Sequence, residues 1–201
     1  MGYFTLRIFK NISFERLFEK VNANLKLYEP GTQVRRHFVQ IFPGINCSAL
    51  RMEYTTRQDE IFRVLGYQFG CVWMDVRYQD GDWWDVTVME GPEHRCTHSV
   101  NPWTHEENYK YDQKVIDYRI NKVCEFWPEF ADRLRPYLLP WGMPVRKFGI
   151  TRFVRRQGKA HESDRRGYGD AEQIYDFVRV FGIDEHHKQI IPAFEIPAGE
   201  K

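Results

Sequence analysis

The sequence lacks the short motifs that identify many enzymes. It contains no GxSxG nucleophile elbow, no Walker A loop, no GxGxxG turn and no HExxH zinc motif. Its longest apolar runs fall far below the ~20 residues that cross a bilayer, and the first residues show no apolar core of a signal peptide. The four cysteines, at 47, 71, 96 and 124, have no CxxC spacing. We therefore expect reduced thiols in a cytoplasmic protein without a membrane span.

An excess of charge of one sign is also lacking, since 29 Lys and Arg face 28 Asp and Glu, for a net charge of +1. This balance disfavours a domain dedicated to nucleic acid or to a membrane surface, although it allows a local basic patch. Aromatic residues, by contrast, make up 16% of the 201 residues. They suffice to fill a core without disulfides or metal, and a stacking surface for bases or sugars is their alternative use.

The stretch from Gly66 to Gly91 predicts a β-hairpin, with strands Phe69 to Tyr78 and Trp83 to Met89 joined through Asp80-Gly81. A two-residue turn would pair Val76 with Asp85. In that register Trp73 and Val88 share one face, whereas Asp75 and Asp85 project to opposite faces. Both faces carry large apolar groups, so we expect both to be covered and the hairpin to lie in the middle of a sheet.

The rest of the chain mixes strands and helices without regular β-α-β alternation. Extended segments are predicted at 3–9, 34–42, 49–54, 94–100 and 147–154, and helices at 13–28, 59–65, 115–127 and 170–181. Ser13 is the expected N-cap of the first helix, Gly66 the stop of the second, and the tail after Asp184 is expected to be irregular. These patterns predict an α+β fold with an antiparallel sheet centred on the 69–89 hairpin and helices packed on it. We expect a single domain over 1–201, with a sub-boundary near 103–112 and a flexible loop at 155–169.

A cluster of metal-ligand residue types runs from His94 through Cys96 to His98, with His105 further on. On a regular strand the first three share one face, as three ligands of zinc might. However, His94 and His98 would lie about 13 Å apart at roughly 3.3 Å per residue, which is too far for one ion. We therefore expect no metal and no other cofactor.

The acidic residues of the hairpin suggest a small hydrolase or nuclease-like enzyme. They are Asp75, Asp80, Asp82, Asp85 and Glu90. The register given above separates Asp75 from Asp85, and Asp80 and Asp82 suit a turn. We therefore assign no catalytic residue, and the sequence favours a non-enzymatic protein; an enzyme that uses acidic or histidine residues near the hairpin stays as the alternative.

The clearest departure from the neutral average is the segment 143–167, in which eight Lys and Arg face two acidic residues. Such a segment can steer an acidic protein partner, or phosphates of a nucleic acid, by charge. Its predicted binding residues are Arg146, Arg152, Arg155, Arg156, Lys159, Arg165 and Arg166. We expect an acidic protein partner, with nucleic acid as the alternative.

Two segments carry a resemblance to known proteins. DGDWWDVTVMEG, followed by NPW, and AEQIYDFVRVFGI resemble segments of uncharacterised soluble bacterial proteins with a DxDxW-like hairpin and a short C-terminal helix. Small α+β proteins of this sort are similar to the SUKH-type immunity proteins, which neutralise bacterial toxins. The resemblance implies a cytoplasmic protein-interaction module of the immunity type. It assigns a role to no individual residue.

Overall fold

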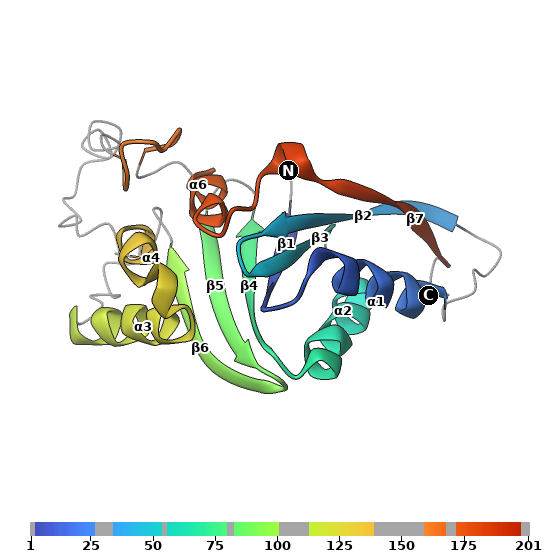
Figure 1. Cartoon of the computed structure of the whole chain (residues 1–201), viewed down its shortest axis with the longest axis horizontal. Coiled ribbons are helices and arrows are strands. Elements are labelled where there is room, and N and C mark those ends of the chain that lie inside the picture. The colour runs from blue at the N-terminus through green and yellow to red at the C-terminus, as the bar shows by residue number, and fades with distance from the viewer. Residues whose placement is uncertain are drawn as a thin grey trace.

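The computed structural model describes residues 3–26, 34–53, 56–79, 83–100, 113–138, 159–167 and 172–197. Within these ranges the strands form one antiparallel sheet of seven strands in the order β6-β5-β4-β1-β3-β2-β7. Helices lie on both faces of this sheet (Figure 1). The predicted α+β class and antiparallel sheet are therefore confirmed.

The described elements are seven strands, five α-helices and two 3-10 turns. The strands are β1 (Tyr3–Lys10), β2 (Val34–Gly44), β3 (Cys47–Glu53), β4 (Val72–Gln79), β5 (Trp83–Glu90), β6 (Glu93–Val100) and β7 (Gln189–Pro197). The helices are α1 (Phe14–Lys26), α2 (Thr56–Phe69), α3 (Gln113–Phe126), α4 (Ala131–Leu138) and α6 (Gln173–Arg179), with 3-10 turns η1 (Pro128–Phe130) and η2 (Glu185–His187). Ser13 caps α1 as predicted, because its Oγ accepts the backbone N–H of Arg16 at 3.3 Å.

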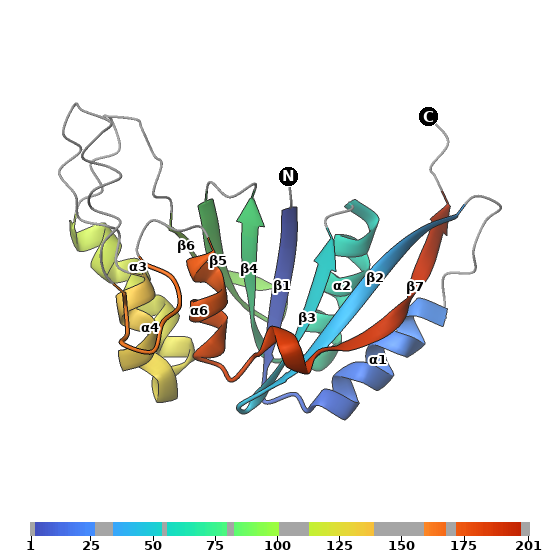
Figure 2. The ribbon, with the colours of Figure 1, turned by 90° about the horizontal axis from the view of Figure 1, so that it is seen from above.

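The first six elements have the connectivity β1-α1-β2-β3-α2-β4, and their strands lie in the order β4-β1-β3-β2. Each helix thus joins two strands that have a third strand between them, which is the split βαβ arrangement of ferredoxin-like folds. Strands β5 and β6 extend the sheet beyond β4, and β7 extends it beyond β2 (Figure 2). The central strand is β1, and both strands of the predicted hairpin are interior strands.

Successive side chains along each strand point to opposite faces of the sheet, and apolar side chains form one hydrophobic core on each face. Phe4, Leu6 and Ile8 of β1 point into the larger core, beneath α3, α4 and α6. Phe9, at the end of the same strand, points into the smaller core with residues of α1 and α2. Because β1 contributes to both cores, it joins the two layers of helices.

The register of the hairpin differs by one residue from the prediction. Val76 pairs with Val86, Arg77 with Asp85, and Gln79 with Trp83, so three residues separate the strands instead of two. A shift of one residue moves a whole strand's side chains to the other face. Trp73 and Val88 are buried as predicted, at 2% and 0% exposure, but they lie in different cores. Asp75 and Asp85 consequently share a face.

Helix α2 does not stop at Gly66, as the sequence suggested, but continues to Phe69 and is followed by Gly70 with φ of +58°. Gly66 packs against the ring of Trp73, and a Cβ at this position would lie 2.3 Å from the indole Nε1. That nitrogen donates to the carbonyl of Gly91 at 3.0 Å. Gly66 is therefore a packing glycine inside a helix, and the predicted strand from Phe69 begins only at Val72.

Three further expectations are corrected or lie outside the described residues. The tail is not irregular, because β7 pairs with β2 at the sheet edge, where proline is tolerated. The predicted sub-boundary at 103–112 and the predicted strand at 147–154 fall outside the described residues.

Candidate functional site

Of the seven predicted binding residues, three lie in the described segment 159–167. Arg165 and Arg166 line a cleft beside α6, and Lys159 is exposed at the start of the segment. Arg146, Arg152, Arg155 and Arg156 lie outside the described residues. The structure therefore places two of the predicted arginines at a concave site.

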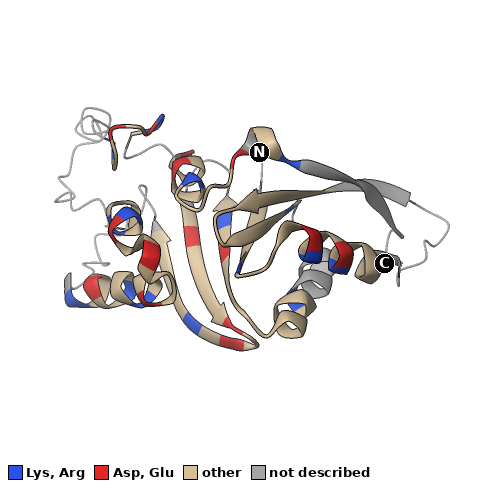
Figure 3. Cartoon of the chain, in the orientation of Figure 1, with Lys and Arg blue, Asp and Glu red and all other residues tan. Residues whose placement is uncertain are grey.

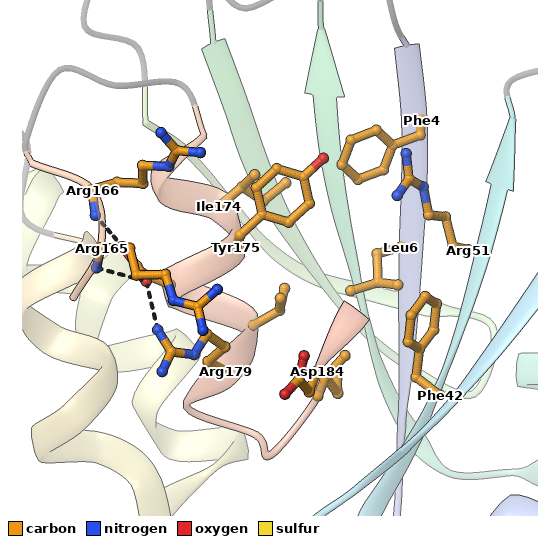
Figure 4. A pocket seen from close by; sticks show the side chains of 13 residues that line it. Phe4, Leu6, Phe42, Arg51, Arg165, Arg166, Ile174, Tyr175, Arg179 and Asp184 are labelled. Atoms are coloured by element: carbon orange, nitrogen blue, oxygen red, sulfur yellow. Dashed lines mark hydrogen bonds and ion pairs between the residues drawn. The ribbon is translucent and has the colours of Figure 1, made fainter. Parts of the chain in front are cut away.

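This cleft lies between α6, with the segment before it, and the strands β1, β3 and β2 (Figure 4). It encloses about 690 Å³ of empty space, including its opening to solvent. Four arginines line it, Arg51, Arg165, Arg166 and Arg179, against the two carboxylates of Asp176 and Asp184. We call this site the basic cleft.

The wall that carries Arg165 and Arg166 is held in place by Asp176 of α6. The buried carboxylate of Asp176 accepts the backbone N–H groups of Arg165 at 3.2 Å and of Arg166 at 2.7 Å. A second buried acid, Asp164, accepts the hydroxyl of Tyr137 and, at 2.8 Å, the backbone N–H of His161. These bonds attach the segment to α6 and α4 and leave its arginine side chains exposed.

Carboxylates accompany three of the four arginines. Arg179 contacts Asp176 at 3.1 Å, and Arg166 forms an ion pair with Glu172. Asp184 accepts the backbone N–H of His186 at 2.9 Å, which lowers the pKa of this carboxyl, and the nearby charge of Arg165 lowers it further. These contacts order the wall at α6, and the cleft still has more cations than anions.

The floor of the basic cleft is apolar. It consists of Phe4, Leu6, Phe42, Ile174, Val178 and Ile183. The ring of Tyr175 stacks on that of Phe4 at 6.1 Å between centroids and spans the space between the two walls (Figure 4). A ligand in this cleft would meet a hydrophobic surface bordered by guanidinium groups.

Figure 3 shows charged positions on β4, β5 and β6. The corrected hairpin register brings two of them, Asp75 and Asp85, to one face of the sheet. Both carboxylates there are bound by arginine. Arg7 donates to both oxygens of Asp75 at 2.6 and 2.8 Å, and Arg77 donates to Asp85 at 2.9 Å. Burial raises the pKa of Asp85, and the guanidinium of Arg77 opposes this rise.

Polar side chains continue this network across the sheet. Arg77 also donates to Thr87 at 3.3 Å, Thr87 contacts Thr97 at 3.1 Å, and Thr97 contacts His94 at 2.9 Å. Every described carboxylate of the hairpin face thus has a structural partner. The prediction that Asp75 and Asp85 project to opposite faces was wrong. Of the other predicted acids, Glu90 lies on the opposite face and pairs with Arg95 at 2.7 Å, and Asp80 and Asp82 lie outside the described residues.

The predicted His-Cys-His alignment is also corrected. Val88 pairs with Cys96 whereas the next residue, Met89, pairs with His94, so a bulge at Arg95 turns His94 to the face opposite Cys96 and His98. Cys96 and His98 are buried in the larger core, and His94 is exposed. No group of three or more His, Cys, Asp or Glu in the described part of the chain could hold a metal. His105 lies outside that part.

Sequence reasoning missed Arg51, Arg179 and the anchoring role of Asp176. Arg179 and Asp176 stand three residues apart on the helix predicted at 170–181, and this spacing was the available signal. Arg51 had no such signal, because its relation to α6 depends on tertiary packing.

No helix within the described ranges combines the length and the apolarity that crossing a bilayer demands. Comparison with protein-family models, with curated proteins and with solved structures finds no match to this chain.

Proposed function

We propose that this protein is a non-enzymatic, cytoplasmic interaction module that binds an acidic protein partner in the basic cleft. The observation that carries the proposal is the convergence of arginines from three separate parts of the chain on one concave, apolar-floored site. The excess of cations there contrasts with a chain whose net charge is only +1. Clustering of one charge sign in a concave site favours a ligand of the opposite sign.

The structure gives less support to the alternative of a hydrolase at the hairpin. The carboxylates of Asp75 and Asp85 are each held by an arginine, which is an arrangement for stability of the sheet. The apolar floor of the basic cleft also suits a protein surface better than a bare phosphate backbone, since phosphate contacts require only cations and polar donors.

An immunity protein that neutralises a bacterial toxin is one form of such a module. In that form the acidic partner is the toxin, and the gene of the partner is expected next to the gene of this protein. Co-expression of the two chains would then relieve the toxicity of the partner. A neighbouring gene whose product has no toxicity would contradict the immunity form and leave the binding proposal in place.

The binding proposal is tested by charge reversal at the cleft wall. In the variant Arg165→Glu/Arg166→Glu, an acidic partner captured by the wild-type chain from a lysate of the source cell should be lost. The control variant Lys20→Glu/Arg133→Glu makes the same change in net charge at exposed positions of α1 and α4. It should retain the partner, and equal denaturation midpoints of all three proteins establish that the fold is intact.

Association of the captured partner should be steered by charge, so its rate should fall steeply as salt increases. The Debye length shrinks from about 10 Å at 0.1 M to about 3 Å at 1 M. Surface plasmon resonance over this range measures the slope for the wild type and both variants. Equal salt slopes in the wild type and the cleft variant, or an identical set of captured proteins, contradict the proposal. Capture of nucleic acid in place of protein favours the alternative.

A further inference from the structure

Arg51 differs from the other three arginines of the basic cleft. It lies in β3, where it pairs with Leu6 of β1, and it shares its face of the sheet with residues of the larger core. Its guanidinium carbon stands 4.1 Å from the centre of the Phe4 ring. Among the described residues no carboxylate pairs with it, whereas Arg165, Arg166 and Arg179 each have an acidic neighbour.

The cation–π contact holds the Arg51 guanidinium against the Phe4 ring. A guanidinium that uses its face on an aromatic ring keeps its N–H edge for a ligand, and that edge matches the two oxygens of a carboxylate. The side chain is only half-buried, and Figure 4 shows its guanidinium beside the Phe4 ring on the sheet side of the cleft. Arg51 is therefore a cation at the border of an apolar floor.

The floor next to Arg51 is formed by Leu6, Phe42 and Ile183, together with Ile174 and Val178 of the opposite wall. Each of these side chains is at most 6% exposed, so the floor offers a limited apolar surface that a bulky apolar group could remove from water. A small polar anion would leave the floor uncovered. Within the described residues, the site thus combines one cation that lacks a carboxylate partner with an apolar surface.

We infer that the basic cleft recognises a carboxylate directly beside a bulky apolar side chain of the partner, with Arg51 as the residue that binds the carboxylate. This inference rests on the proposed function and deepens it, because it specifies what the acidic partner inserts. A single cation of this kind suits a carboxylate, which carries one negative charge. A nucleic-acid backbone repeats its charge along the chain and is bound through several cations.

Small probes test this inference on the full chain. Titrations followed by amide chemical shifts compare N-acetyl-leucine with its neutral amide, N-acetyl-leucinamide, and with N-acetyl-alanine. The carboxylate should bind about tenfold more tightly than the amide, as expected for loss of one hydrogen-bonded ion pair, and shifts should centre on β1, β3 and α6. The leucine probe should also bind more tightly than the alanine probe.

The preference for the carboxylate should disappear in Arg51→Gln and recover in part in Arg51→Lys, which restores the charge without the planar fork. The control variant Arg133→Gln should keep the preference, because Arg133 is exposed on α4 and does not line the basic cleft. Phenyl phosphate is included in the series to represent phosphate ligands. Unchanged dispersion of the amide spectrum establishes that each variant is folded.

The inference is overturned by equal binding of the acid and the amide, by a preference that persists in Arg51→Gln, or by no binding of N-acetyl-leucine at millimolar concentration. Tighter binding of phenyl phosphate than of N-acetyl-leucine also overturns it and points to a phosphorylated ligand. Its failure is distinguishable from failure of the proposed function. If the partner is lost on reversal of Arg165 and Arg166 but is retained by Arg51→Gln, the proposed function is supported and the role of Arg51 is contradicted.

Discussion

At the scale of single residues, the contact between Gly66 and Trp73 links helix α2 to the sheet. The indole of Trp73 occupies the space where a side chain of residue 66 would lie, and its N–H reaches the carbonyl of Gly91. Trp73 is 2% exposed and its other neighbours belong to the smaller core. The helix therefore approaches β4 closely only because residue 66 has no Cβ.

The substitution Gly66→Ala is expected to destabilise the protein, although alanine in place of glycine usually stabilises a helix interior by about 1 kcal/mol. The added methyl group overlaps the buried indole, and overpacking of this kind typically costs about 1–3 kcal/mol. Urea denaturation measures the free energy of unfolding. In the background Trp73→Phe the same substitution should cost less, and an equal cost in both backgrounds would contradict the proposed contact.

A second residue, His98, makes stability depend on pH. It is 3% exposed in the larger core beside the backbone of Leu138, and neither ring nitrogen makes a hydrogen bond of good geometry with the described residues. Burial lowers the pKa of His98 from 6.5 to about 4. Between these two values the unfolded chain binds the proton more tightly than the folded chain does, so acid favours unfolding.

The free energy of unfolding is therefore expected to contain a His98 contribution that is complete above pH 6.5 and is lost as pH falls to about 4. Its size is roughly 3 kcal/mol, at 1.36 kcal/mol for each pKa unit. Denaturation of the wild type and of His98→Leu at several pH values between 4 and 6.5 measures this contribution, since the variant should lack the part of the pH dependence that His98 causes. The exposed control His94→Gln should keep it, and a variant curve parallel to the wild type would contradict the assignment.

At the scale of elements, α6 and the segment before it form one wall of the basic cleft. The attachment depends on the buried carboxylate of Asp176, which accepts two backbone N–H groups and contacts Arg179. The stripe Ile174, Phe177, Val178 and Phe181 packs the helix onto the larger core. The position of the arginines is thus set by hydrogen bonds, and the position of the helix by apolar burial.

Asp176→Asn is expected to lower stability by about 1.5–3 kcal/mol, because it weakens hydrogen bonds to a charged acceptor and leaves an amide N–H among donors. Hydrogen exchange should accelerate selectively at the amides of Arg165 and Arg166, and the unfolding midpoint should fall. The control Asp132→Asn changes an exposed acid of α4 and should have neither effect. Unchanged protection of the two amides in Asp176→Asn would show that other contacts hold the wall.

At the scale of the whole molecule, β1 connects the two cores. It pairs with β3 on one side and β4 on the other, and it sends side chains to both faces. Neither core can lose its packing without disturbing this strand. The layers on the two faces should therefore unfold together.

We predict one cooperative unfolding transition. With 5-fluorotryptophan in place of tryptophan, the folded resonances of Trp73 in the smaller core and Trp127 in the larger core should vanish at the same denaturant concentration. Leu50→Ala in one core and Leu134→Ala in the other should each shift both midpoints together, with losses of about 2–5 kcal/mol. Separate midpoints for the two resonances would reveal two independent units and contradict the single domain.

The sequence by itself determined the class of fold and the approximate positions of most described elements. Periodicity, helix caps and turn residues act over a few neighbouring residues. The N-cap Ser13, the strand at 3–9 and the helix at 170–181 could therefore be predicted directly from the sequence. Gly182, with φ of +74°, directly follows the predicted end of this helix at residue 181. The basic character of residues 143–167 likewise follows from composition alone.

Only the tertiary structure decided which residues meet. The loop length set the hairpin register, and a shift of one residue brought Asp75 and Asp85 to one face. Gly66 lies inside a helix, where it packs against Trp73. The proline-containing strand β7 pairs with β2 at the edge of the sheet. The basic cleft joins Arg51 of β3 to Arg165 and Arg179 near α6, and no local pattern relates them, because their proximity results from packing that helix onto the sheet.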